Sequence, residues 1–256
     1  MKTTHICKIQ EIDEIASGIY NVMVICPEIA KIAEAGQFLH IDCGDGINNM
    51  LRRPISICDT TNDTVRFIFE TKGSGTKWLS QRVAGNTLDI VGPVGNSFVI
   101  SERYEKPVII GGGIGVFPLY MLAKQLDNAQ VLLGFRSIDR VVMEQEFATV
   151  SKSTTVATDD GSYGYQGYAV ELLEKILQMG DADIIYSCGP APMLKAVKLL
   201  AEKYKVKCQL SLEQRMGCGI GACLVCTCET TAQGMEKHKR VCKDGPIFWS
   251  DEIVLS

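Results

Sequence analysis

Hydrophobic positions in the first part of the chain come in short runs that are separated by turns. Several of these runs alternate apolar and polar side chains, and this period of two is typical of half-buried strands. The runs are Ile19–Ile25, Phe38–Asp42, Ile55–Asp59, Thr64–Glu70 and Thr87–Val91. One helix is expected among them, from Thr76 as N-cap to Ala84, with Gly85 as its stop signal. Many short strands with Gly-rich turns predict an antiparallel β barrel over residues 1–100.

The pattern changes after residue 100, where apolar strands begin to alternate with helical stripes. The expected strands are Val108–Ile110, Val131–Gly134, Thr155–Ala157, Ile184–Ser187 and Cys208–Leu210. Two helical stripes lie between them, one formed by Leu119, Leu122, Ala123 and Leu126 and the other by Met193, Val197 and Leu200. Alternation of strand and helix predicts an α/β domain with a parallel sheet over residues 101–210. Residues 211–256 are rich in Cys and Gly and short of regular pattern, which indicates a small third domain.

Composition narrows the class of protein. The chain has 256 residues, of which 46% are hydrophobic, and a net charge of −4, so it has enough apolar side chains for packed domain cores. It has no long basic stretch, which argues against nucleic acid and anionic membranes as partners. We find no apolar run of ~18 residues and no signal-peptide core, so a cytoplasmic protein is expected. In a reducing compartment the 11 cysteines are more often metal ligands or free thiols than disulfides.

The cysteines gather near the C-terminus in a spacing with a known chemistry. Cys218, Cys223 and Cys226 follow the pattern C-x4-C-x2-C, and Cys242 supplies a fourth thiolate further along. This is the plant-type spacing for a [2Fe–2S] cluster. We therefore expect these four cysteines to be metal ligands.

The residues around these cysteines support a cluster rather than another metal site. Gly217, Gly219 and Gly221 allow the loop to curl tightly and point its N–H groups at sulfur. A structural zinc site is the alternative, but zinc usually takes paired cysteine knuckles separated by a longer loop. Cys228 does not fit the spacing, and we interpret it as a cysteine that does not bind the metal. The alternative is that Cys228 is a ligand in place of one of the nearby cysteines.

Two motifs in the first domain suggest that it binds a nucleotide. Arg53, Pro54, Ile55 and Ser56 open a strand, where an Arg fork can grip a pyrophosphate and a Ser hydroxyl can reach a flavin ring nitrogen. Gly75 and Thr76 belong to a Gly-Ser-Gly-Thr turn before the expected helix, and such turns offer bare N–H groups to phosphate. Each motif alone is commonly a surface charge or an ordinary helix cap, but the pair is more specific.

The second domain has a nucleotide motif of its own. A turn formed by Gly111, Gly112, Gly113, Ile114 and Gly115 follows the first strand, in the position that cradles phosphate in dinucleotide-binding folds. Val116 occupies the place of the third glycine of the usual fingerprint, and no clear acidic residue ends the strand Val131–Phe135. The residues alone therefore leave NAD and NADP as alternatives.

A later strand of the second domain ends in Cys188, Gly189 and Pro190. The carboxyl ends of parallel strands are where such folds bind ligands, so we expect these residues near the nicotinamide. The alternative is that Cys188 is a small buried hydrophobic residue.

The order of these motifs resembles the ferredoxin–NADP reductase superfamily over residues 5–210. That resemblance implies a six-stranded antiparallel FAD barrel followed by a nucleotide-binding domain. The C-terminal segment is similar to the electron-transfer subunits of NAD-dependent dihydroorotate dehydrogenases. By this resemblance, the cluster ligands would be the four cysteines named above, and FAD would be held by Arg53, Pro54, Ile55, Ser56, Ile68, Phe69, Glu70, Gly75 and Thr76.

The resemblance also implies a function and a partner. Electrons would run from dihydroorotate through FMN in a separate catalytic subunit to the [2Fe–2S] cluster, then to FAD and NAD⁺, within a heterotetramer of two copies of each chain. A self-standing or ferredoxin-linked NAD(P)H:acceptor reductase and a zinc-stabilised binding module without redox activity are the alternatives. The three histidines, His5, His40 and His238, are isolated in sequence and are assigned no role.

Overall fold

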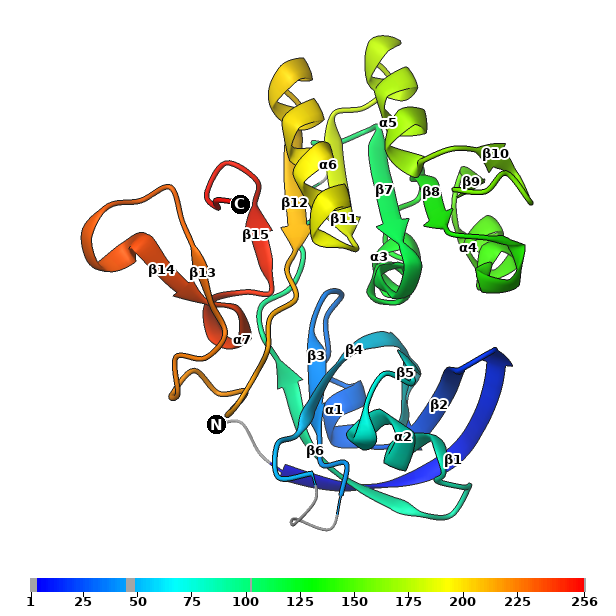
Figure 1. The fold of residues 1–256 in the computed structure, drawn as a ribbon, viewed down its shortest axis with the longest axis vertical. Coiled ribbons are helices and arrows are strands. Elements are labelled where there is room, and N and C mark those ends of the chain that lie inside the picture. The colour runs from blue at the N-terminus through cyan, green and yellow to red at the C-terminus, as the bar shows by residue number, and fades with distance from the viewer. Residues whose placement is uncertain (1–3, 45–48, 102, 256) are drawn as a thin grey trace.

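The N-terminal part of the chain forms a closed antiparallel barrel, as the sequence pattern predicts. The computed structural model describes residues 4–44, 49–101 and 103–255. Six strands close the barrel in the order β1-β2-β5-β4-β3-β6 (Figure 1). Their bounds are β1 Thr4–Ala16, β2 Ile19–Ile25, β3 Phe38–Ile41, β4 Arg53–Thr60, β5 Thr64–Glu70 and β6 Thr87–Val94. The short helix α1, Pro27–Ala30, follows β2.

The helix of the barrel begins earlier than the sequence suggests. Helix α2 spans Ser74–Ser80 with Gly73 as its N-cap, so Thr76 is the third helical residue and not the cap. The hydroxyl Oγ1 of Thr76 accepts hydrogen bonds from the backbone N–H groups of Gly73 at 3.1 Å and Lys72 at 2.9 Å. The predicted N-cap was therefore wrong, because Thr76 reaches back to cap the helix from inside.

The second part of the chain forms the predicted parallel sheet with helices packed on it. Its strand order is β10-β9-β8-β7-β11-β12-β15, and every pair from β10 to β12 is parallel. The strands are β7 Pro107–Gly112, β8 Gln130–Phe135, β9 Ser153–Thr158, β10 Tyr165–Gln166, β11 Ile184–Cys188 and β12 Lys207–Ser211. The helices are α4 Glu144–Val150, α5 Ala169–Gln178 and α6 Ala191–Tyr204, with a 3₁₀ turn at Ile138–Arg140.

The connection after β7 joins the sheet to the barrel. It is a 3₁₀ helix, η1 (Gly113–Leu119), which contains Pro118 and runs on into the short helix α3 (Tyr120–Ala123). The helix η1 packs against β4 and β5 of the barrel as well as β7 and β11 of the sheet. The glycine-rich turn at its start therefore lies where the two layers meet.

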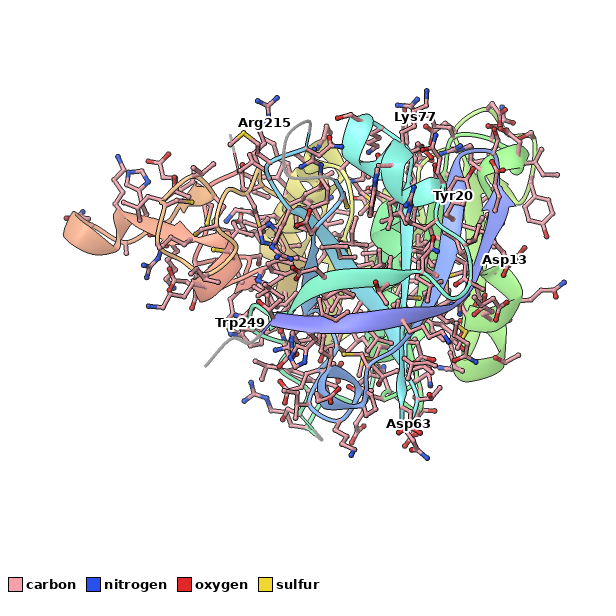
Figure 2. The ribbon with its side chains drawn as sticks, turned by 90° about the horizontal axis from the view of Figure 1, so that it is seen from below. Asp13, Tyr20, Asp63, Lys77, Arg215 and Trp249 are labelled. Atoms are coloured by element: carbon pink, nitrogen blue, oxygen red, sulfur yellow. The ribbon has the colours of Figure 1, made fainter. Side chains whose placement is uncertain are left out.

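The Cys-rich C-terminal segment has more regular structure than its sequence pattern indicates. It contains β13 Thr227–Glu229, a 3₁₀ turn Gly234–Lys237, β14 His238–Arg240, α7 Val241–Asp244 and β15 Ile247–Trp249. Strands β13 and β14 form a small antiparallel pair, while β15 adds an antiparallel edge strand to the large sheet by pairing with β12. Figure 2 shows the rest of the segment projecting from one side of the molecule, with Trp249 toward that side.

The C-terminal segment is also tied to the barrel. The side-chain amide of Asn96, just after β6, donates to the carbonyl of Ile247 at 2.8 Å and accepts from its N–H at 2.9 Å. The backbone N–H of Asn96 donates to the carbonyl of Gly245 at 2.7 Å. The segment is thus fixed to both larger parts of the molecule. Within the described residues, no helix is both long and apolar enough to cross a lipid bilayer.

Candidate functional site

The first pair of predicted ligands shares one tight turn of the loop. The Sγ atom of Cys218 accepts hydrogen bonds from the backbone N–H groups of Ala222 at 3.3 Å and Cys223 at 3.4 Å. In return, the N–H of Cys218 donates to Sγ of Cys223 at 3.4 Å. Gly219 and Gly221, with φ of +67° and +85°, provide the left-handed turns that this curl requires. The two sulfur atoms therefore lie in a pocket of inward-pointing N–H groups.

The second pair is brought together by contacts between the loop and helix α7. The N–H of Cys242 donates to Sγ of Cys226 at 3.4 Å. The guanidinium of Arg240 donates to the carbonyl of Gly221 at 2.9 Å, and the same side chain forms an ion pair with Asp244 at 3.0 Å. Arg240 therefore fastens the curled loop to the segment that carries Cys242.

The pKa values of Cys218 and Cys242 are shifted by the groups around them. Burial by itself would raise the pKa of Cys218, but the N–H groups of Ile220, Cys223 and Ala222 lower that pKa to about 6. Burial raises the pKa of Cys242 to about 12, and the neighbouring sulfur atoms of Cys226 and Cys218 act in the same direction. Two hydrogen-bonded pairs of cysteines, Cys218 with Cys223 and Cys226 with Cys242, with N–H donors aimed at their sulfur atoms, fit an anionic metal–sulfur group, which needs thiolate ligands.

Cys228 lies beside this group on strand β13, opposite Lys239 of β14. Its side chain is 7% exposed, and burial raises its pKa. The hydrogen bonds to sulfur described above join Cys218 with Cys223 and Cys226 with Cys242, and none of them involves Cys228.

One edge of the cysteine group faces solvent. Cys223 is exposed, whereas Cys226 and Cys242 are 2% and 1% exposed. Three large apolar side chains around the exposed edge are themselves more than half exposed: Ile220 at 51%, Leu224 at 62% and Val225 at 55%. An exposed apolar rim around a reactive group is typical of a surface that docks another protein.

The two motifs of the barrel come together in space. The guanidinium of Arg53 lies directly against Gly75, because a Cβ atom at Gly75 would be 2.6 Å from Nε and 2.9 Å from Nη2 of Arg53. Arg53 also donates a hydrogen bond to the carbonyl of Leu51, and Ser74 donates to the side chain of Asn49 at 2.6 Å. A positive fork beside a turn of bare glycine is an arrangement that can bind a pyrophosphate.

The remaining barrel residues are placed differently from one another. Arg53, Pro54, Ile55 and Ser56 are all half-buried on β4, so a ligand can reach them. In contrast, Ile68 and Phe69 of β5 are 3% and 2% exposed, with their side chains in the hydrophobic core. Glu70 forms ion pairs with Arg140 and Lys72. The sequence predicts that all of these residues hold FAD. In the structure, Arg53 lies against Gly75, whereas the Glu70 carboxylate is paired with Arg140 and Lys72.

The two motifs of the α/β part also meet. Strands β7 and β11 are parallel neighbours, and Gly111 pairs with Cys188. A Cβ atom at Gly115 would lie 2.5 Å from the carbonyl oxygen of Cys188, and one at Gly112 would lie 3.0 Å from Cδ of Pro190. Bare glycine is therefore required for the close approach of the two turns. Burial raises the pKa of Cys188 to about 12, which keeps it a neutral thiol near pH 7.

One residue of the site was missed by sequence reasoning. His40 on β3 is 1% exposed, and its ring lies against Gly219 of the cysteine loop, where a Cβ atom would be 2.4 Å from Nδ1. Burial, followed by the positive charges of Arg52 and Arg53, lowers the pKa of His40 to about 4, and the nearby backbone of Arg52 acts in the opposite direction. The available signal was a histidine inside the otherwise apolar strand Phe38–Ile41.

Solved structures share this fold. The structure described as "the NADH-dependent reduced ferredoxin-NADP oxidoreductase structure", from a study of flavin-based electron bifurcation, is similar with a TM-score of 0.88 and 30% identity, covering 100% of this chain and 92% of that one. A ferredoxin NADP⁺ reductase from Neisseria gonorrhoeae has a TM-score of 0.67 at 16% identity over 80% of this chain and 92% of its own, which shows likeness of fold.

Sequence relatives match the chain over nearly its whole length. Residues 213–254 match the family model of the iron–sulfur cluster binding domain of dihydroorotate dehydrogenase B. The electron transfer subunit of dihydroorotate dehydrogenase B (NAD(+)) from Bacillus mycoides is 41% identical over 252 residues, covering 94% of this chain and 95% of the relative. The subunit from Bacillus cereus is 41% identical over 253 residues with the same coverage. The chain therefore belongs to the family of electron transfer subunits of dihydroorotate dehydrogenase B (NAD(+)).

Proposed function

We propose that this chain binds a [2Fe–2S] cluster and FAD and passes electrons between a catalytic partner subunit and NAD⁺. The observation that carries the proposal is the order of the motifs in space. The cysteine loop touches β3 through Gly219 and His40, β3 pairs with the Arg53–Ser56 strand, and η1 packs against that strand. A one-electron site, a flavin site and a nicotinamide site would thus follow one another across the molecule.

Each motif supplies the groups that one cofactor requires. Cys218, Cys223, Cys226 and Cys242 would hold the cluster, as the N–H donors to sulfur within each of the two cysteine pairs suggest. The cluster would supply single-electron exchange and the flavin would convert between one- and two-electron transfer. The protein itself positions these groups and excludes water from their inner side, where Cys226 and Cys242 are buried.

The barrel and the sheet would hold the two nucleotides. The Arg53 guanidinium and the turn at Gly75 and Thr76 would bind the FAD pyrophosphate, with Pro54, Ile55 and Ser56 beside the flavin and Ile68, Phe69 and Glu70 in a supporting place. The turn Gly111–Gly115 would carry the phosphates of NAD, with Cys188, Gly189 and Pro190 next to the nicotinamide. The close packing of Gly115 on Cys188 supports a single site formed by both turns.

The overall reaction balances with these carriers. Dihydroorotate would lose two electrons and two protons at FMN in the catalytic subunit. NAD⁺ would accept both electrons with one proton, and the second proton would pass to solvent. This chain would not bind dihydroorotate itself, and its part is confined to electron transfer.

The exposed edge of the cluster loop supports docking of the catalytic subunit. Ile220, Leu224 and Val225 are more than half exposed around Cys223. A partner that covers them would bury apolar surface and shorten the path to the cluster. We place this contact in a heterotetramer with two copies of each chain, located in the cytoplasm, where a reducing environment keeps the cysteines available as ligands.

A second candidate function has a specific observation in its favour. The full-length similarity to the NADH-dependent reduced ferredoxin-NADP oxidoreductase, at a TM-score of 0.88, fits a reductase subunit with a different redox partner. The cofactors would be the same in this alternative, and the protein docked at the loop of Ile220, Leu224 and Val225 would differ.

Reconstitution of the two-subunit enzyme tests the proposal directly. The chain is purified without oxygen together with the FMN-type dihydroorotate dehydrogenase subunit of its own organism, and NADH formation from dihydroorotate and NAD⁺ is followed by absorbance. We expect NADH only when both chains are present. If FAD and cluster are intact and NADH is oxidised by artificial acceptors, yet dihydroorotate gives no NADH, the partner assignment is wrong and the second candidate stands.

A matched pair of cysteine variants tests the ligand set. Cys223→Ser should lose the cluster and electron transfer to the partner while keeping FAD, because a hydroxyl is a poor replacement for a thiolate ligand. Cys228→Ser should keep both cofactors. Iron, acid-labile sulfide and FAD are measured per chain, and a full cluster in Cys223→Ser or its loss in Cys228→Ser would overturn the assignment.

A further inference from the structure

His40 lies between the motifs assigned to the cluster and those assigned to FAD. On one side its ring contacts Gly219, where a Cβ atom would be 2.4 Å from Nδ1 and 2.9 Å from Cε1. On the other side, the pairing of β3 with β4 sets His40 opposite Pro54, in the strand that begins with Arg53. The residue therefore touches the turn between Cys218 and Cys223 and neighbours the flavin strand.

The ring of His40 has polar atoms that the polypeptide does not satisfy. The residue is 1% exposed, and neither Nδ1 nor Nε2 has a hydrogen-bond partner among the described residues. Buried polar atoms are almost always paired in folded proteins, and an unpaired one calls for an explanation. The fold thus keeps a donor and an acceptor ready for a group that is not part of the polypeptide.

The geometry indicates which group this is. Nδ1 is the ring atom that lies nearest to Gly219, in the loop whose N–H groups already point at the sulfur atoms of Cys218 and Cys223. A neutral imidazole carries one N–H donor and one acceptor nitrogen. Sulfur in an iron–sulfur group accepts hydrogen bonds, and such bonds tune its reduction potential. Because the left-handed Gly219, with φ of +67°, has no side chain, the ring can approach the turn closely.

We propose that His40 is a positioning residue for electron transfer that donates a hydrogen bond from Nδ1 to the iron–sulfur group of the loop and raises its reduction potential. Reduction adds negative charge to the group, so a hydrogen-bond donor stabilises the reduced form more than the oxidised form. The inference rests on the proposed function, because it requires the cluster to be present. It adds a residue of the barrel to the environment of a cluster whose ligands all come from the C-terminal segment.

A redox titration of the assembled two-subunit enzyme tests the proposal. His40→Leu removes the donor, His40→Gln keeps an N–H donor, and His238→Gln, at an exposed position of β14, is the matched control. Iron, sulfide and FAD are measured first, and the reduced cluster is then followed by electron paramagnetic resonance against applied potential. At the wild-type midpoint we expect the ratio of reduced to oxidised cluster to fall about tenfold in His40→Leu, equal to about 59 mV. His40→Gln should shift less, and His238→Gln should not shift.

A labelling experiment gives a second readout that does not depend on the folding of a variant. The chain contains three histidines, so wild-type protein labelled with ¹⁵N-histidine has few sources of a nitrogen signal. We expect a ¹⁵N coupling to the reduced cluster in pulsed electron paramagnetic resonance, and its loss in His40→Gln.

The outcomes separate the two proposals. A wild-type midpoint in a fully loaded His40→Leu, or no ¹⁵N coupling in loaded wild-type protein, would overturn the role of His40 and leave the proposed function intact. Wild-type protein purified without oxygen that contains no iron and sulfide would instead contradict the proposed function itself.

Discussion

The molecule has two glycine-rich turns beside its nucleotide motifs, and they are built from different atoms. In the barrel, Gly75 lies against the charged end of a flexible side chain, 2.6 Å from Nε of Arg53 as measured from its ideal Cβ position. In the sheet, Gly115 lies against fixed backbone, 2.5 Å from the carbonyl oxygen of Cys188 by the same measure. One glycine makes room for a cation, whereas the other makes room for a neighbouring strand.

This difference suggests how each nucleotide is held. A guanidinium fork gives strong charge-assisted bonds to phosphate, which suits a cofactor that stays bound. The atoms nearest to the Cβ positions of Gly112 and Gly115 belong to uncharged residues, namely Cys188, Gly189, Pro190 and Met193. A neutral turn binds phosphate through N–H groups alone, which suits a nucleotide that must leave after each turnover. On the proposed assignment, FAD is resident and NAD exchanges.

The largest effect is expected from Gly115→Ala. The new Cβ atom would meet the backbone of Cys188 and Gly189 at 2.5–2.6 Å, so the start of η1 must move away from the end of β11. We expect a loss of about 3 kcal/mol or more in the free energy of unfolding, the upper end for overpacked sites, because the clash is with backbone atoms. NADH oxidation with an artificial acceptor should fall, while FAD stays bound. Thermal unfolding and acceptor assays check this, and wild-type values in both would refute the backbone role of this turn.

The next effect in size is expected from Arg53→Ala. Loss of charge-assisted bonds to the pyrophosphate, worth about 1.5–3 kcal/mol, should weaken FAD binding roughly 10- to 100-fold. Arg53→Lys keeps the positive charge but loses the forked guanidinium, so its affinity for FAD should lie between those of Arg53→Ala and the wild type. FAD retained on gel filtration and the fluorescence of released FAD provide the measurement. Equal retention in Arg53→Ala and wild type would remove Arg53 from the pyrophosphate site.

The smallest effect is expected from Gly75→Ala, and it sharpens the contrast between the turns. Its Cβ atom would meet the movable end of Arg53, so the fold can adapt by displacing the guanidinium. We expect FAD binding to weaken by a few-fold, on the order of 1 kcal/mol or less, with little change in thermal unfolding. Gly73→Ala is the control, because nothing lies within 4 Å of its Cβ position. If Gly75→Ala lost more stability than Gly115→Ala, the turn at Gly75 would be the more rigid of the two, contrary to our interpretation.

Much of the fold could be predicted because the strands differ in how they are buried. The period of two in Ile19–Ile25 and Thr64–Glu70 gave bounds that agree with β2 and β5. Strand β1 was missed because most of its residues are exposed and polar, with Cys7 and Ile9 fully buried among them. Its pairing with β2 and β6 makes it a strand, and pairing across the barrel is not visible in local sequence.

The site was predictable as a set of motifs but not as an arrangement. The spacing of Cys218, Cys223, Cys226 and Cys242 is typical of a [2Fe–2S] cluster, so four ligands could be proposed without a structure. The contact of Arg53 with Gly75 and of Gly219 with His40 depends on how distant segments pack. His40 was passed over because a single histidine in an apolar strand is only a weak signal, and its unpaired nitrogens are seen only in the structure.

The C-terminal segment is fixed to the barrel and to the sheet, and these two contacts limit how the cysteine loop could be transferred to another protein. The side chain of Asn96 forms hydrogen bonds with the backbone of Ile247, and β15 pairs with β12 at the edge of the sheet. A graft of the cysteine loop alone onto a two-domain flavoprotein would leave it without either anchor. To transfer the segment, the end of the recipient's barrel and the edge of its sheet would have to be redesigned as well. The segment therefore depends on the two domains that it packs against.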